Sequence, residues 1–397
     1  MMATASGISS SLAAGPTLAA GREPILDIPA AETVMDVINR YSVPEISLPF
    51  VIVPLFVLML LFYRQWTKPV VFALLMVLFV AGYFGAMFVS YDYLQIIRKP
   101  DNVPITIMLL GLALCLWTAF REAAINDGRI REGKPLRAEG KDDKVLVWPD
   151  LVYTEMICIL LASFALIVWS VLLKAPLESP ANPAGPPNPS KAPWYFLGLQ
   201  EMLVYYDPWM AGVLLPGLIV VGLIAMPYID TNPKGNGYYT FAQRKFAITV
   251  WMFGFLILWV VLIVFGTFLR GPNWNFFGPF EYWNANRQVP LTNVNLSDYF
   301  WLWGLNKPLP TRDTHGGLYW LVRELPGILF VVFWIFGLPM VLAKTVMRRM
   351  VEQMGMPRFL VMASLLVVMA MLPLKMVLRW VVTLKYFVYL PEFNLNY

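Results

Sequence analysis

The sequence predicts an all-α integral membrane protein with about eight transmembrane helices. Hydrophobic residues make up 58% of its 397 positions and charged residues only 14%, which is more apolar surface than a soluble core needs. The apolar residues also fall into separate runs. Each run is close to the roughly 20 residues that a helix needs to cross a bilayer.

The chain begins with a tail and three of these runs. Residues 1–46 are rich in Ala, Ser, Gly and Pro and lack the charged start and apolar core of a signal peptide, so we expect a tail with an interfacial helix at 30–41. The segment 47–120 carries no chemical motif, and we expect it to pack around the rest of the chain or to dock another subunit. Its predicted spanning helices are 48–63, 70–91 and 104–120.

A charged segment at 121–147 is the best marker of topology. It contains seven Arg and Lys residues between two apolar runs, and positive residues in short loops stay on the cytoplasmic side. Otherwise such a charge run is a solvated face. With this segment inside, both termini lie on the outer side of the membrane, and the basic links 230–245 and 344–358 lie inside.

The middle of the chain alternates apolar runs with an unusual connector. A run at 151–173 is followed by a proline-rich connector at 174–189, which cannot form a regular helix and must lie where water or protein satisfies its carbonyls. Pro193-Trp194-Tyr195-Phe196 comes next, before runs at 212–226 and 246–268. This aromatic segment suits the membrane interface beside a flat apolar ligand, and an ordinary aromatic belt is the alternative.

Four features follow one another in this part of the chain: Trp148-Pro149-Asp150-Leu151 at the start of one membrane helix, the proline-rich loop, Pro-Trp-Tyr-Phe, and two further helices with a polar link. Together they resemble the C-terminal half of cytochrome b. The similarity is to subunit IV of cytochrome bf complexes and to the split cytochrome b of bacterial quinol:cytochrome c reductases, with the unit spanning 148–270. It implies a membrane subunit of a quinol:cytochrome c oxidoreductase in the bacterial inner membrane. Such a subunit forms part of the outer quinol-oxidation site and couples electron transfer to proton release.

The histidine count decides how the haems are distributed under this resemblance. Each b haem of the family takes two axial imidazoles, whereas this chain has one histidine, His315. The resemblance therefore implies that a partner subunit with the N-terminal half of cytochrome b carries the b haem and shares the quinol, menaquinol or ubiquinol, with this chain. It also implies an iron–sulfur protein and a c-type cytochrome as partners.

Two further classes of ligand are not expected for this chain. The net charge of +5 is spread over loops rather than gathered in a patch, so nucleic acid is not expected as a partner. His315 has no second ligand at metal spacing, so we expect a surface hydrogen bond there and no metal site.

The resemblance places Pro193, Trp194 and Tyr195 at the outer quinol site. Ala192 and Pro193 stand where the family often has Pro-Glu, so the carboxylate that would accept a quinol proton is missing. Glu201 is the nearest substitute, about two helical turns after Trp194, and we expect it to bind quinol and accept the proton. Asp207 is a weaker candidate, and a water-exposed interfacial Glu201 is the alternative.

The family's second, quinone-reducing site lies at the inner face, with a carboxylate near the start of the helix at 151–173. Asp150 and Glu155 are the candidates there, with Glu155 the better placed. An acidic first turn also favours the helix dipole, which is the alternative reason for these residues.

The rest of the chain comprises a long loop and two helices. The polar and aromatic loop 271–325 is expected on the outer face, where it would cover or dock a partner. The segment 326–397 is expected to contain helices at 326–343 and 359–382, whose basic Lys375 and Arg379 snorkel to the headgroups.

A membrane transporter, or a purely structural anchor subunit of another respiratory complex, is the alternative function for the whole chain. A transporter usually carries charges in the middle of its helices. In this sequence the charges cluster at the ends of the apolar runs, which favours the quinol oxidoreductase.

Overall fold

The computed structural model describes residues 26, 28–137, 145–172, 180–232, 239–393 and 395–397. Over these residues it is helical, apart from turns, irregular links and one short antiparallel pair, β1 (Tyr389–Leu390) and β2 (Leu395–Asn396). Within the described residues, eight helices are long and apolar enough to cross a membrane, which confirms the predicted all-α membrane class. These spans are Pro44–Leu61, Pro69–Val89, Asn102–Arg131, Val147–Leu172, Met210–Ile229, Lys245–Leu269, Arg312–Lys344 and Met356–Val382.

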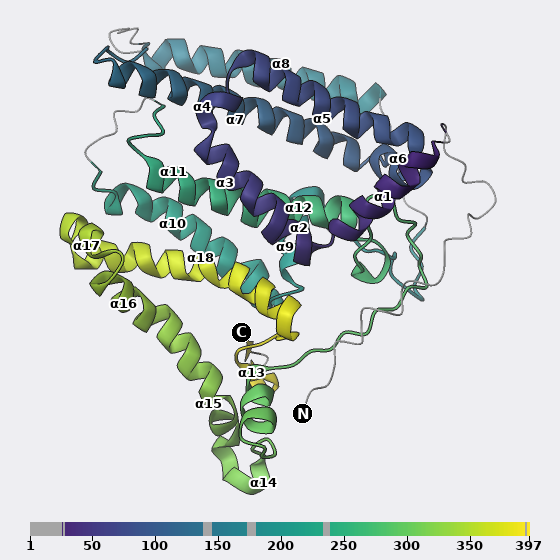
Figure 1. Cartoon of the computed structure of the whole chain (residues 1–397), viewed down its shortest axis with the longest axis vertical. Coiled ribbons are helices and arrows are strands. Elements are labelled where there is room, and N and C mark those ends of the chain that lie inside the picture. Colours follow the sequence, from purple (N-terminus) through teal and green to yellow (C-terminus); the bar gives the residue numbers. More distant parts are fainter. Residues whose placement is uncertain (1–25, 27, 138–144, 173–179, 233–238, 394) are drawn as a thin grey trace.

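Several spans are built from more than one helical segment. In Figure 1 they contain, in order, α2 (Pro44–Ser47) and α3 (Val53–Leu61), α5 (Pro69–Val89), α7 (Asn102–Arg131), α8 (Val152–Leu172), α10 (Leu215–Ile229), α11 (Lys245–Met252) and α12 (Val261–Val264), α14 (Arg312–His315), α15 (Tyr319–Val332) and α16 (Leu338–Lys344), and α18 (Met356–Val382). The shorter linking helices are α1 (Pro29–Tyr41), α4 (Tyr63–Trp66), α6 (Tyr91–Arg98), α9 (Leu197–Met202), α13 (Leu296–Asp298) and α17 (Arg348–Met354). The helix predicted at 30–41 is thus present as α1.

Two hydrogen bonds between distant parts of the chain mark the two ends of the bundle. At one end of the bundle, Asn126 near the end of α7 donates to the carbonyl of Tyr239 (2.9 Å), which precedes α11. At the other end, the amide of Phe280 donates to the Asn39 side chain of α1 (2.9 Å). We call the first end the α4 end and the second the α9 end.

A buried carboxylate joins the first three spans to the rest of the chain at the α4 end. Asp127 is 1% exposed, and its Oδ2 accepts hydrogen bonds from the Tyr63 hydroxyl (2.8 Å) and from the amides of Phe241 (3.2 Å) and Ala242 (2.9 Å). Burial and this carboxylate together raise the pKa of Tyr63. The prediction of a loop from residue 121 is therefore wrong for its first part, because α7 continues to Arg131 to bring Asp127 into this junction.

The loop predicted at 271–325 is also shorter than expected. It contains α13, and the seventh span already begins at Arg312, so His315 lies in α14. The predicted helix start at Pro326 is therefore wrong. The structure instead keeps Pro326 inside α15, where the helix runs on either side of it.

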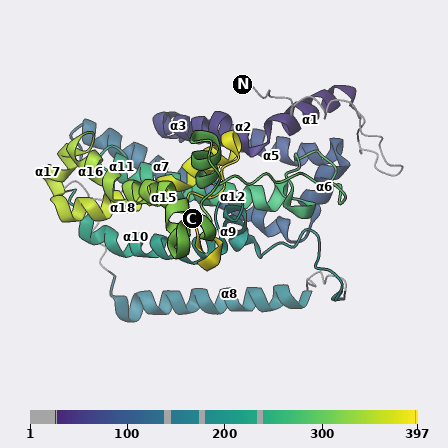
Figure 2. The same cartoon turned by 90° about the horizontal axis from the view of Figure 1, so that it is seen from below.

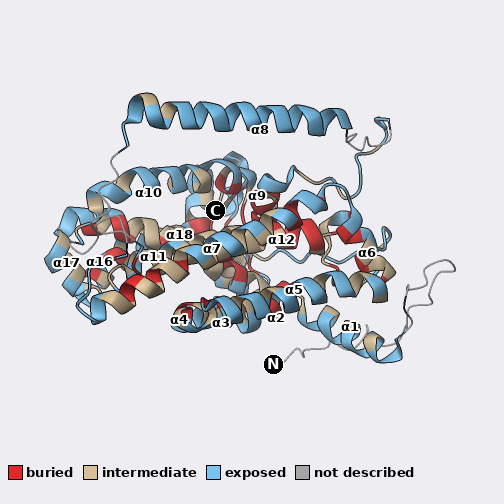
Figure 3. Cartoon of the chain, turned by 90° about the horizontal axis from the view of Figure 1, so that it is seen from above, coloured by how far each residue is buried: buried red, intermediate tan, exposed pale blue. Residues whose placement is uncertain are grey.

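The main core surrounds α9 and its neighbours, whereas α8 contributes nothing to it. Tyr205, Met210, Leu262 and Met371 are among the most deeply buried side chains of this core. No residue of α8 is buried. Figures 2 and 3 show α8 lying apart from the other helices, with its surface exposed along its length.

The Asp127 junction gives a stability prediction. Replacing Asp127 with Ala leaves the amides of Phe241 and Ala242 and the buried Tyr63 hydroxyl without this acceptor, and we expect a loss of about 3 kcal/mol in the free energy of unfolding. Glu122→Ala is the control on the helix that carries Asp127. It breaks a more exposed pair with Arg137 and is expected to cost at most about 1 kcal/mol. Thermal unfolding in detergent checks both values. Equal stabilities of the two variants would refute the role of the junction.

Candidate quinol site

The aromatic segment forms a single helical turn that is held in place by its neighbours. Trp194–Phe196 is one 3-10 turn leading directly into α9. The ring of Tyr195 packs against Trp259 of the sixth span, with 5.5 Å between the ring centroids, and against the edge of Trp194 at 5.6 Å. Trp194 and Tyr195 are nevertheless 41% and 50% exposed, so they present a free aromatic surface at the α9 end.

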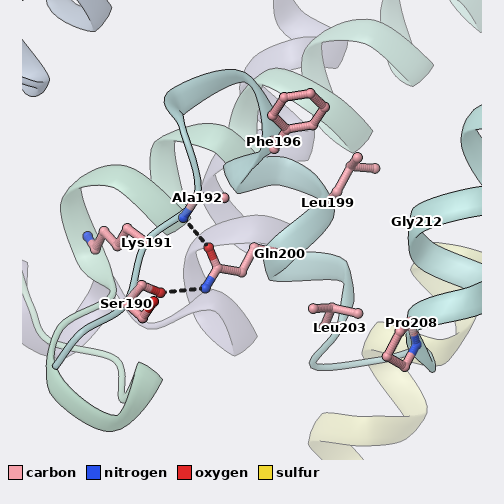
Figure 4. Close-up of a pocket in the computed structure, with 9 residues that line it drawn as sticks. All are labelled: Ser190, Lys191, Ala192, Phe196, Leu199, Gln200, Leu203, Pro208 and Gly212. Atoms are coloured by element: carbon pink, nitrogen blue, oxygen red, sulfur yellow. Dashed lines mark hydrogen bonds between the residues drawn. The ribbon is translucent and has the colours of Figure 1, made fainter. Parts of the chain in front are cut away.

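The chain before this turn is tied to α9 and to the sixth span. The Gln200 side chain accepts a hydrogen bond from the amide of Ala192 and donates to the carbonyl of Ser190, each at 2.9 Å (Figure 4). Lys191 donates to the carbonyl of Thr267 (2.8 Å), and burial, together with the charges of Lys99 and Arg270, lowers the pKa of Lys191 to about 7. The approach to the aromatic turn is therefore fixed by backbone as well as side-chain contacts.

Glycines allow α9 to lie close against the sixth span. A Cβ atom on Gly198 would come within 3.3 Å of the Ile263 side chain, and one on Gly266 would come within 3.0 Å of the Leu197 carbonyl oxygen. Both distances are tighter than ordinary van der Waals contact. The close approach fixes the aromatic turn and the side chains of α9 relative to the end of the sixth span.

A pocket of about 500 Å³ opens beside the turn (Figure 4). Phe196, Leu199 and Leu203 give it an apolar wall, and Gln200 is the polar side chain of α9 that faces it. The predicted residues Pro193, Trp194 and Tyr195 lie beside this pocket rather than in its wall. Its lining residues are Ser190, Lys191, Ala192, Phe196, Leu199, Gln200, Leu203, Pro208 and Gly212.

Glu201 lies behind the pocket in a buried ion pair. It is 0% exposed, and its two oxygens accept hydrogen bonds from Nε and Nη2 of Arg270, at 2.9 and 2.6 Å. Burial lowers the pKa of Arg270, but the Glu201 carboxylate outweighs burial and the pKa is raised overall. Both oxygens of Glu201 are thus engaged by Arg270. In the sequence, Arg270 is a charged residue at the end of an apolar run. That pattern alone does not identify Glu201 as its partner.

Asp207 and Lys375 form a second polar cluster near the C-terminal tail. Asp207 accepts hydrogen bonds from the Tyr386 hydroxyl (2.7 Å) and the Asn396 amide (2.9 Å). Lys375 is 1% exposed, so the expectation that it snorkels to the headgroups is wrong. Its ammonium lies 4.4 Å from the ring centroid of Tyr206, and three rings of the tail surround it at 5.3 to 5.8 Å, those of Tyr386, Phe387 and Tyr397.

The remaining predicted residues are not gathered into a site. Asp150 and Glu155 are both exposed at the start of the fourth span, away from the core. His315 is exposed, and its Nδ1 lies 2.8 Å from the Thr314 hydroxyl, in keeping with a surface hydrogen bond. In the part of the chain that the structure describes, no group of three or more His, Cys, Asp or Glu side chains is arranged to hold a metal ion.

The comparison with known families identifies the region around the pocket. Residues 180–280 match the family described as cytochrome b (C-terminal)/b6/petD. They form a cytochrome b C-terminal-like unit. No match was found among solved structures.

The cytochrome b C-terminal-like unit therefore includes the aromatic turn, the pocket and the Glu201–Arg270 pair. The match begins in the proline-rich connector and ends at residue 280, so it leaves out α8, which the predicted unit of 148–270 included. Over this region the chain is similar to subunits of cytochrome b/b6f-type complexes, and eight helices of the described residues are long and apolar enough to cross a bilayer.

The ion pair of this unit gives a second prediction. Arg270→Gln leaves the buried Glu201 carboxylate unpaired, and we expect it to lower the free energy of unfolding by about 3–5 kcal/mol. Glu201→Gln/Arg270→Gln is expected to lose less, because neither charge then remains buried alone. Arg287→Gln, which breaks a half-exposed pair with Glu281, is the control and should cost at most about 1 kcal/mol. Denaturation in detergent measures all three, and Arg270→Gln no less stable than Arg287→Gln would contradict a buried pair.

Proposed function

We propose that this chain is a haem-free membrane subunit of a quinol:cytochrome c oxidoreductase of the cytochrome bc type. It forms part of the outer quinol-oxidation site and couples electron transfer to proton release. The observation that carries this proposal is the coincidence of the family match at 180–280 with an apolar pocket next to an exposed aromatic turn. Such a pocket suits the flat ring and apolar tail of a quinol, either menaquinol or ubiquinol.

The residues of this chain do not fit a b haem. The single histidine, His315, cannot supply the two imidazoles that a b haem takes, and it is exposed on α14. The haem then belongs to a separate subunit that resembles the N-terminal half of cytochrome b. An iron–sulfur protein and a c-type cytochrome complete the proposed assembly as electron acceptors.

The exposed parts of the chain leave room for such a subunit. The rings of Trp194 and Tyr195 are about half exposed, and α8 has no buried residue. The aromatic turn stands beside the pocket in the part of this chain that matches cytochrome b, and α8 precedes that part in the sequence. We propose that the helices of the haem-bearing subunit pack against α8 and the aromatic turn, so that the two proteins enclose the quinol together.

In this site the chain's own residues would position the quinol and take up a proton. The side chains of Phe196, Leu199 and Leu203 would exclude water from one side of the quinol ring. The hydrogen bonds of Gln200 with Ala192 and Ser190 hold this wall in position. Oxidation of a quinol releases two protons, so a base is needed within reach. Glu201 remains our proposed acceptor at this outer site; because Arg270 holds both its oxygens, taking the proton requires one of these bonds to open.

We propose that the α9 end of the bundle faces outward from the bacterial inner membrane, with both termini on that side. The α4 end carries more of the basic residues, including Arg64, Lys68, Arg129 and Arg131, and positive residues favour the cytoplasm. Asp150 and Glu155 would then lie at the inner face, where we propose a second quinone site.

One observation favours the alternative function, a transporter or a structural anchor. Lys375 is a charge buried within the eighth span, where the sequence suggested that charges stay at the helix ends. Its contacts are with rings of this chain's own tail, so within this chain it holds the tail against the eighth span. Purification of the native complex decides between the two functions, because only the quinol oxidoreductase requires a haem-bearing partner.

Replacing Glu201 with Gln tests the proposed proton acceptor. Gln is close in shape and keeps a hydrogen-bond acceptor for Arg270, but it cannot take up a proton at neutral pH. We expect quinol oxidation by the purified complex to slow by about 10²-fold or more, with haem content unchanged. Asp313→Asn, at an exposed carboxylate of α14, is the control and should retain full turnover. Full turnover in Glu201→Gln would remove Glu201 as the acceptor.

Filling the pocket tests the quinol site itself. Leu203→Trp adds a bulky side chain to the pocket wall, and we expect the KM for quinol to rise at least tenfold while the haem spectrum stays the same. Leu223→Trp places the same side chain on the exposed surface of α10 and should leave the KM unchanged. If both variants oxidise quinol with the KM of the native complex, quinol does not bind in this pocket.

A further inference from the structure

An apolar groove lies on the surface of the bundle towards the α4 end, far from the aromatic turn in the sequence. Its volume is about 590 Å³, and it lies between α10, α18 and the seventh span. Ser364 is the one hydroxyl-bearing side chain in its lining. The lining residues are Val221, Ile335, Phe336, Pro339, Met340, Leu360, Val361, Ser364 and Leu365.

The part of the groove lined by α18 lies between the start of this spanning helix and its middle. Leu360 is in the first turns of α18, and Leu365 follows nine residues after the first residue of that helix, Met356. At about 1.5 Å per residue this is a depth of roughly 14 Å, close to half of a hydrocarbon core of about 30 Å. The groove therefore has the reach of an acyl chain that enters from the α4 end.

The segment that joins the two groove-lining helices α16 and α18 is basic. The seventh span ends at Lys344, α17 starts with Arg348 and Arg349, and Arg358 lies two residues before Leu360; all four side chains are exposed. Glu352 is the one acidic residue of α17, and it pairs with Arg348 at 3.1 Å. The segment 344–358 thus carries a net positive charge, and it lies next in sequence to the groove-lining residues Met340 and Leu360.

The linking helix α17 lies between the ends of the seventh and eighth spans, where lipid headgroups are expected. Its Met350 and Met354 pack with Met347 against a small core that contains the fully buried Phe359. Its Arg348 and Arg349 point the other way and are exposed. Figure 1 shows α17 at the corner where α16 turns back into α18, so one short helix holds both the packing contact and the charges at this corner.

We propose that this groove is a binding site for an acidic phospholipid. The phosphate lies at Arg349, Arg358 and Lys344, and one acyl chain fills the groove between α16 and α18. Arginine side chains bind phosphate through charge-assisted hydrogen bonds, and basic sites between transmembrane helices suit anionic headgroups. A helix of another protein would fill the apolar groove but would leave these basic side chains without an anion, so charge complementarity favours the lipid.

This inference does not depend on the quinol-oxidoreductase proposal. The bound lipid would support the corner formed by α16, α17 and α18, because it fills space that neighbouring side chains leave open. Its affinity would come from the phosphate contacts as well as from the buried chain. A zwitterionic phospholipid has the same chains but a neutral headgroup, so it should bind the groove more weakly.

Two variants and a control test the site on the native complex, purified in mild detergent. Arg349→Gln/Arg358→Gln removes two phosphate contacts, and Val361→Trp blocks the groove while leaving the charges in place. Lys68→Gln/Lys245→Gln removes two exposed charges at the same end of the bundle from helices outside the groove. Native mass spectrometry counts the phospholipids that remain bound, after reconstitution in nanodiscs of phosphatidylglycerol or of phosphatidylcholine alone.

We expect the unaltered complex and the Lys68/Lys245 control to retain phosphatidylglycerol, and both groove variants to retain at least tenfold less. Phosphatidylcholine should be retained weakly by all of them. Equal retention of phosphatidylglycerol by the unaltered complex and both groove variants would overturn the proposal, as would an equal loss in the control. Release of a protein subunit by Val361→Trp, with lipid retention unchanged, would show that the groove is a protein interface instead.

Discussion

The buried ion pair between Glu201 and Arg270 is the contact on which the cytochrome b C-terminal-like unit depends. It joins α9 to the end of the sixth span, with both carboxylate oxygens engaged and Glu201 fully buried. Because a buried charge without its partner is costly, the two residues hold α9 in one position. The aromatic turn that precedes α9, and the pocket beside that turn, take their geometry from this position.

Similar buried polar contacts close the other links between the spans. Asp127 joins the end of α7 to the segment before α11, and Glu324 accepts hydrogen bonds from Arg323 and from the amide of Tyr389, each at 2.9 Å. Association of helices within a bilayer gains little from the hydrophobic effect, since lipid tails are as apolar as the side chains. In this chain, specific polar contacts near the ends of the spans fix which helices are neighbours.

The number and class of the helices could be predicted from the sequence because each span is a long apolar run with its own composition. The ends of the spans could not be predicted as well. The helix ending at Arg131 continues past its apolar part to bury Asp127, a contact formed with residues more than 100 positions away. The predicted helix start at Pro326 is likewise not an end, because α15 continues on both sides of it.

The same distinction applies to the candidate site. Trp194, Tyr195 and Glu201 were recognised because they form a local motif, and the structure places them on one turn and the helix that follows it. Arg270 and the ring cage of Lys375 depend on tertiary contacts, since the partners of each come from separate segments of the chain. No spacing in the sequence distinguishes a lysine that snorkels to the headgroups from one enclosed by the rings of a folded tail.

The most direct test of the quinol-oxidoreductase assignment is the dithionite-minus-ascorbate difference spectrum of the native complex, purified through a tag on this chain, with its co-purifying subunits identified. We predict a b-type haem signal that belongs to a histidine-containing membrane subunit. A preparation without haem and without such a subunit would contradict the assignment and would leave a transporter or an anchor as the function.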